Sequence, residues 1–222
     1  MKTLTITVGV LIGLVLLLPL TQVAAAPMLV NTHKPQHGGG STTGGAANID
    51  LVQCDAGGAA KWKDPAVSYK IDNVAGVTAD VINAIDKGVQ EWNNIGGPYT
   101  LTRDDSAPNP DVTIKVFFKI TPGYILGASF VTCPDTSTGI IPHEIWLGVK
   151  GLKLNGVQTL AAHEAGHSVG LGHADKNADL MGPSLDSTER RNVTCPSNLD
   201  KGALSATGTY YSVTEWQLLT SC

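Results

Sequence analysis

The sequence lacks several features that would assign it to a common functional class. It has no block of basic residues and a formal net charge of −4, so a nucleic-acid partner is not expected. None of its four cysteines lies in a Cys-x-x-Cys pair, which argues against a zinc knuckle built from thiolates. There is no internal repeat, and the one long apolar run, residues 8–20, is shorter than the roughly 20 residues that span a bilayer.

That apolar run belongs to a pattern typical of a secretory signal peptide. A lysine precedes it and the small residues of TQVAAAP follow it. Val23 and Ala25 suit the −3 and −1 positions, so residues 1–25 are predicted to be removed and the rest to be secreted. If the segment were kept, it would tether the chain to a cell surface. Residues 26–50 are rich in Gly and Thr and predict a flexible tether, and residues 51–222 predict one folded domain.

The four cysteines are Cys54, Cys133, Cys195 and Cys222. An even number behind a signal peptide favours two disulfides, for which three pairings exist. We expect Cys195–Cys222, which would fix the C-terminal tail, together with Cys54–Cys133. Asn192 begins a glycosylation sequon that matters only in a eukaryotic host.

The spacing of apolar residues predicts an α+β domain. Strands are expected at residues 66–72, 111–118, 124–131 and 139–149, and helices at 78–97, at 156–170 and in a short C-terminal segment. Ser212 and Glu215 predict a capping box at the start of that last helix. Pro142 predicts that the strand over 139–149, at least at its start, lies on a sheet edge.

The segment HEAGHSVGLGH, residues 163–173, carries three of the six histidines of the chain. His163 and His167 are four residues apart on one helical face, so both imidazoles can reach one ion. Gly170 would end the helix and bring His173 round as a third ligand, which leaves the fourth zinc position for water. Glu164 projects beside the pair, where it can meet that water. The alternative is an ordinary helix whose histidines are exposed or hydrogen-bonded and bind no metal. A third histidine six residues after the second, beyond a glycine, disfavours this alternative.

The motif HExxHxxGxxH followed by a methionine turn resembles the metzincin signature. Within that clan the chain is similar to the matrixins, on the segments KWKDPAVSYKIDN, VINAIDKGVQEWNN, DVTIKVFF, ILGAS and LMGP. The resemblance covers about residues 61–185. It implies a metzincin-type catalytic domain with a mixed, mostly parallel small sheet, an active-site helix, a methionine turn at Met181 and a C-terminal helix. By the same resemblance, Pro183 and Leu185 would help to form the pocket for the side chain after the cleaved bond.

The chain also departs from the matrixin pattern. Gly182 replaces the usual tyrosine, and Ala174 and Asp175 follow the third histidine where serine is usual. Snapalysin-like small neutral proteases are the nearest alternative, but they use aspartate in place of His173. A cysteine that caps the zinc is a second reading of Cys54, although VQCDAG matches the latency pattern of matrixins only at the cysteine.

The resemblance implies a monomeric zinc endopeptidase with one catalytic Zn²⁺, while a structural Ca²⁺ is left open. Glu164 would act as the general base for a zinc-activated water. A protein or peptide substrate would lie extended along the edge strand over 139–148. A catalytically inactive zinc-containing peptide-binding module and a non-peptidase hydrolase remain alternatives.

Overall fold

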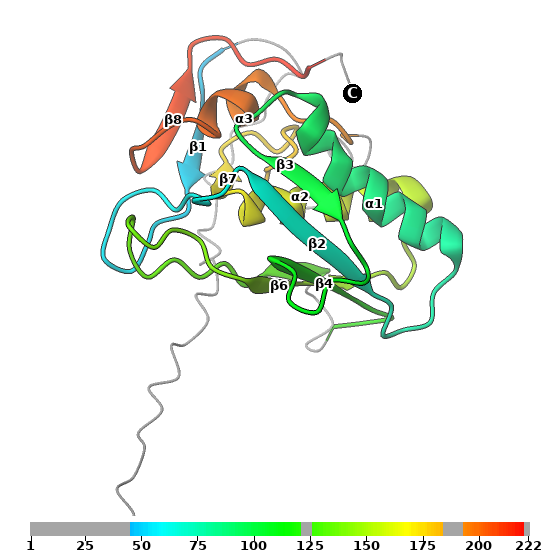
Figure 1. The fold of residues 1–222 in the computed structure, drawn as a ribbon. Coiled ribbons are helices and arrows are strands. Elements are labelled where there is room, and N and C mark those ends of the chain that lie inside the picture. Colours follow the sequence, from blue (N-terminus) through cyan, green and yellow to red (C-terminus); the bar gives the residue numbers. More distant parts are fainter. Residues whose placement is uncertain (1–44, 121–125, 184–192, 220–222) are drawn as a thin grey trace, which may run out of the picture.

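The computed structural model describes residues 45–120, 126–183 and 193–219. A five-stranded sheet is its largest element (Figure 1). In sheet order the strands are β3 (Thr100–Arg103), β2 (Ala66–Asp72), β4 (Val112–Phe117), β6 (His143–Gly148) and β5 (Gly127–Ser129). The first four are parallel and β5 is antiparallel to β6. The expected mixed, mostly parallel sheet of an α+β domain is therefore confirmed.

Two long helices, α1 (Ala79–Asn94) and α2 (Leu154–Ser168), pack against each other and against one face of this sheet. Val89 of α1 and Ala165 of α2 surround the same small apolar space as Tyr69 and Ile114 of the sheet. The buried residues alternate along β4, as a half-covered strand requires. The apolar spacing that predicted these helices and strands thus reflects one shared core.

The contact between the two helices is close because α1 carries a glycine at the crossing. A Cβ added at Gly88 would lie 2.3 Å from the backbone oxygen of Gln158. One turn further along α1, the indole Nε1 of Trp92 donates to the backbone oxygen of Ala162 at 2.7 Å. These contacts fix α2, which carries the motif histidines, against the rest of the core.

A second sheet has three strands, in the order β7 (Leu171–Ala174), β1 (Ala47–Leu51) and β8 (Tyr210–Val213). Both pairings are antiparallel, and the blue β1 and red β8 lie side by side in Figure 1. A short helix, α3 (Asn198–Ala203), packs against this sheet. The strand β1 begins at Ala47, inside the segment predicted to be a flexible tether. Ala47 and Ile49 are fully buried, so this part of the segment belongs to the folded domain. The expected tether boundary at residue 50 is therefore too late.

The position predicted for the C-terminal helix is wrong. Ser212 lies in β8, where its hydroxyl donates to Oδ1 of Asn48 instead of accepting from the backbone N–H groups of a helix N-terminus. The helix lies earlier, at α3, and its capping box is made by Ser197 and Asp200. Pairing with β1, which is more than 160 residues away, overrides the local capping pattern.

The prediction that the strand over 139–149 lies on a sheet edge is also wrong. β6 pairs with β4 on one side and with β5 on the other. Pro142 comes just before β6, where its missing N–H breaks no ladder bond. The edge next to β6 is instead β5, and the opposite edge is β3.

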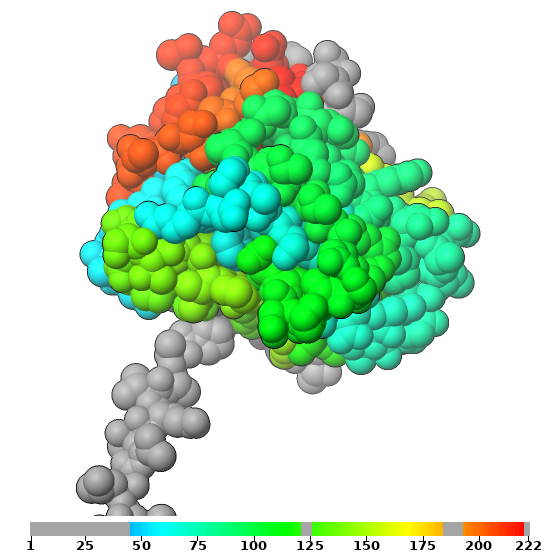
Figure 2. Space-filling view, in the orientation of Figure 1, coloured from blue at the N-terminus to red at the C-terminus, as the bar shows by residue number. Residues whose placement is uncertain are grey.

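The segment after β1 is joined to the loop before β6 by a disulfide between Cys54 and Cys133. This is the expected pairing, and it leaves no Cys54 thiol to bind a metal. Figure 2 shows the cyan and yellow-green segments packed side by side. Cys195 is also disulfide-bonded, while its expected partner Cys222 lies outside the described residues.

Thiol counting under denaturing, non-reducing conditions should find no free thiol. Reduction should lower the free energy of unfolding by about 2–4 kcal/mol, because it frees a long loop in the unfolded chain. Urea unfolding with and without reductant measures this difference. One free thiol that maps to Cys54 would contradict the structure and revive the latency reading.

Candidate metal centre

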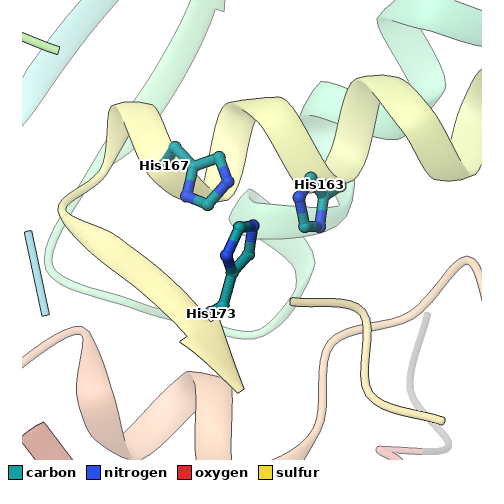
Figure 3. Close-up of side chains that lie close together, drawn as sticks. All are labelled: His163, His167 and His173. Carbon is teal, nitrogen blue, oxygen red and sulfur yellow. The ribbon is translucent and has the colours of Figure 1, made fainter. Parts of the chain in front are cut away.

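The histidines of the motif converge on one point (Figure 3). His163 and His167 lie on the last turns of α2, and Gly170 follows the helix with a φ of 93°. A Cβ at Gly170 would lie 2.3 Å from the backbone oxygen of Ala60, so both the backbone angle and the space require glycine. The chain then reverses into β7, which brings His173 opposite the helix.

The spacing of these side chains suits a single metal ion. One ligand atom from each histidine lies within 4.8 Å of the others, a little wider than the limit of about 4 Å for two nitrogens that each lie about 2.0–2.1 Å from one zinc. The ring centroids are 4.7, 4.9 and 5.4 Å apart. Small side-chain rotations would complete the geometry.

The hydrogen bonds of two of the rings set their tautomer. Nδ1 of His163 donates to the backbone oxygen of Leu180 at 2.9 Å, and Nδ1 of His167 donates to that of Leu171 at 2.7 Å. A carbonyl oxygen can only accept, so the proton is on Nδ1 and Nε2 carries the lone pair with which a neutral imidazole binds a cation. Metal-ligating histidines in proteins usually have such a partner behind the ring. The donor set therefore fits zinc on its own chemistry.

Glu164 is buried and lies between this cluster and the edge strand. A Cβ added at Gly127, the first residue of β5, would lie 2.3 Å from its Oε1 and 2.8 Å from its Cγ. The carboxyl group therefore contacts the backbone of the strand that forms the sheet edge. The buried carboxyl group thus lies against the first residue of the sheet-edge strand.

Met181 is fully buried under the same turn of α2. A Cβ at Gly166 would lie 2.3 Å from its sulfur and 2.6 Å from the ring of Trp92. The preceding residue, Leu180, supplies the carbonyl that accepts from His163. The methionine turn thus packs below the histidine helix and also orients one of its rings.

The chain matches the family model for matrixins over residues 61–206. This match covers more than half of the sequence and includes α2, the three histidines and Met181. The chain belongs to the matrixin family.

A relative and two solved structures resemble parts of this matrixin. The interstitial collagenase of Oryctolagus cuniculus is 28% identical over an alignment of 142 residues, and the match covers 56% of this chain and 28% of that protein. The match therefore spans little more than a quarter of the collagenase. Two structures of myroilysin are 18% and 19% identical, with TM-scores of 0.38 and 0.37. They cover 53% and 51% of this chain and 55% and 47% of theirs.

A buried polar network that sequence reasoning missed supports the methionine turn. Asp179 accepts from the backbone N of Met181 at 2.8 Å, from Nε1 of Trp216 at 2.7 Å and from the hydroxyl of Ser197 at 2.6 Å. Ser197 also accepts from the backbone N of Asp200 as the cap of α3. The Ser-x-x-Asp spacing of this capping box was visible in the sequence. Its connection to the methionine turn was not.

The Asp200 carboxyl group holds its proton to higher pH than an ordinary aspartate. Burial raises its pKa well above the ordinary value, and the neighbouring carboxylate of Asp179 raises it further. A raised pKa is the ordinary result for a buried acid beside a second carboxyl group.

Asp200→Asn should become more stable relative to the wild type as the pH rises. The folded chain holds the Asp200 proton to higher pH than the unfolded chain does. The stability that the wild type gains from this proton is therefore complete below about pH 4 and is lost as the pH rises toward the folded-state pKa. Asparagine keeps a donor and cannot ionise. Urea unfolding of the chelator-treated proteins between about pH 5 and 8 measures the difference. The control is Asp80→Asn in the first turn of α1. If the stability difference between Asp200→Asn and the wild type did not change with pH, like that of the control, the prediction would be contradicted.

The remaining expected site residues are only partly described. Pro183 is half-buried after the methionine turn, and Leu185 lies outside the described residues. His143, the other histidine of the folded domain, does not join the cluster; its Nε2 is 2.8 Å from the hydroxyl of Ser168 and its ring stacks on Trp62. Burial lowers the pKa of His143, which favours a neutral, structural side chain at the end of α2.

Proposed function

We propose that this matrixin is a secreted zinc endopeptidase with Glu164 as its general base. The observation that carries the proposal is the convergence of His163, His167 and His173 within 4.8 Å beside a buried glutamate that faces the sheet edge. A structural zinc site normally has four protein ligands and needs no such carboxylate. Three histidines leave a position open for water.

His163, His167 and His173 would hold the metal through neutral imidazole nitrogens. Zinc held there would lower the pKa of a bound water toward about 7 and would polarise a carbonyl oxygen. Glu164 accepts the proton of the attacking water at a carboxylate oxygen and then gives it to the nitrogen of the leaving amine. No side chain has to form a covalent intermediate, so Ser168, which is buried and bonded to His143, needs no catalytic role.

The substrate is proposed to be a protein or peptide bound in extended form along β5. This strand forms one edge of the five-stranded sheet and contacts α2. On the side away from β6, its backbone pairs with no other strand among the described residues. An added strand would gain main-chain hydrogen bonds that do not depend on sequence. It would also bring a peptide carbonyl close to Glu164, because Gly127 contacts that carboxyl group.

Secretion is proposed from the signal-peptide pattern of residues 1–25, which lie outside the described residues. Among the residues that the structure describes, no helix is both long enough and apolar enough to cross a membrane. Proteins of this composition with paired cysteines are typical of oxidising compartments. The disulfide between Cys54 and Cys133 agrees with this destination.

Incubation of the purified chain with casein tests the activity. We expect cleavage that stops when a chelator removes the metal and returns when about one equivalent of zinc is added. Zinc binding without cleavage of any unfolded protein substrate would favour the inactive peptide-binding module. Absence of zinc from the pure protein would contradict the proposal altogether.

A further inference from the structure

The third metal ligand lies on a strand whose only partner among the described residues is β1. His173 belongs to β7, and β7 pairs with β1 at one edge of the three-stranded sheet. β1 precedes the region that matches the matrixin model, which begins at residue 61. The position of a ligand inside that region therefore depends on a strand outside it.

The pairing of these strands contains an irregularity at the ligand itself. Ile49 pairs with Ala174 and Leu51 with Leu171, so one residue of β1 faces two residues of β7, Gly172 and His173. An extra residue of this kind bends the strand and re-aims its side chains, and such bulges are frequent beside active sites. The register of β1 thus sets the direction in which His173 points.

Close backbone contact keeps this bulge in place. A Cβ at Gly172 would lie 2.9 Å from the backbone oxygen of Asp50, so glycine is needed for the approach. Beyond the bulge on the β1 side, the backbone N of Val52 donates to the oxygen of Gly170 at 3.0 Å. A one-residue slip of β1 would break these contacts and turn the buried Ile49 to the surface.

Asn48 fixes the other end of the pairing. Its backbone N and its side-chain Nδ2 each donate to one carboxylate oxygen of Asp175 at 3.0 Å, and its own backbone oxygen accepts from the backbone N of Asp175 at 2.9 Å. The hydroxyl of Ser212 in β8 donates to Asn48 Oδ1 at 2.5 Å. Asp175 follows His173 by two residues, so this clamp holds the strand immediately after the ligand.

We propose that β1 is part of the metal centre and that Asn48 is a positioning residue for His173. Asn48 touches neither metal nor substrate; it acts by holding the register of β1 against the bulged strand. This inference rests on the proposed zinc site. It also means that the folded catalytic unit begins before Asn48, so activation by removal of an N-terminal segment must leave this residue in place.

The test measures how fast the zinc-loaded full chain releases zinc to an excess of a coloured chelator. Asn48→Asp sets a second carboxylate against Asp175 and removes a donor, and should release zinc about three to ten times faster than the wild type. Asn48→Ala adds no charge and should release zinc about three times faster than the wild type. It replaces Asn48→Asp in the test if that variant does not fold. Asn73→Asp is the matched control and should not change the rate, since Asn73 is an exposed asparagine whose side chain has Val77 as its one hydrogen-bond partner among the described residues.

Rescue separates positioning from general stability. The double variant Asn48→Asp with Asp175→Asn restores a donor facing an acceptor and should return zinc release to within about twofold of the wild type. The melting temperature of the metal-free proteins is recorded in parallel. Wild-type release rates in both Asn48 variants, or no rescue by the double variant, would overturn the inference. A wild-type chain that binds no zinc would instead overturn the proposed function.

Discussion

Glu164→Gln is expected to fold and to bind one zinc per chain, but to hydrolyse peptides about 10⁴-fold more slowly than the wild type. A general base contributes typically about 10²–10⁴-fold, and the upper end applies because Glu164 would serve both proton transfers. Glutamine has nearly the same shape, so the contact with Gly127 is retained while the proton acceptor is lost. The measurement is kcat/KM on a fluorogenic peptide, together with zinc content.

The control for this variant is Glu144→Gln. Glu144 is a half-exposed carboxylate on β6 that pairs with Lys115 and accepts from Trp146. Its loss should leave kcat/KM within about twofold, because surface ion pairs contribute little. If Glu164→Gln kept as much as a tenth of the wild-type activity, Glu164 would not be the base.

The zinc motif could be predicted from the sequence because its geometry is local. Two histidines one helical turn apart and a glycine that ends the helix fix their relation within a few residues. Strand β2 was predicted with its bounds, Ala66–Asp72, because its apolar residues alternate. Helix α1 was predicted at 78–97 and spans Ala79–Asn94, so its start was predicted to within one residue and its end three residues too late.

The parts that were missed depend on contacts between distant segments. β1 reads as polar tether because only Ala47, Ile49 and Leu51 face the core, and a five-residue strand between glycine-rich neighbours gives a weak signal. β3 was missed for a similar reason, since it has four residues and only Leu101 is buried. Neither strand is stable alone, and both form because a partner strand is already present.

The C-terminal segment shows how a correct local pattern can lose to a tertiary contact. Glu215 lies at the helix-capping distance from Ser212, yet the structure uses Ser212 in β8 and buries Trp216 against Asp179. Burial of a tryptophan with a satisfied indole N–H outweighs a cap bond of about 1 kcal/mol. The same contact explains why the methionine turn depends on a residue 35 positions further along the chain, which no local motif could have indicated.

His167→Ala is expected to abolish stoichiometric zinc binding, and with it all peptide hydrolysis. The variant leaves His163 and His173 as the only imidazoles of the cluster, and two ligands cannot enclose zinc as three do. It also removes the hydrogen bond from Nδ1 to the backbone oxygen of Leu171, so the turn that brings His173 to the helix loses a contact. Elemental analysis after gel filtration should give well below one zinc per chain, against about one for the wild type.

His143→Gln is the matched control, because His143 is a buried histidine of β6 that contacts Ser168 at the end of the same helix but lies outside the cluster. It would lose the stacking on Trp62 and part of the hydrogen bonding to Ser168, which should lower the melting temperature. Its zinc content should stay at about one, because the three ligands are unchanged. If both variants lost zinc equally, the lower zinc content would reflect general unfolding rather than the loss of a ligand. A His167→Ala protein that kept its zinc would show that the metal is held elsewhere.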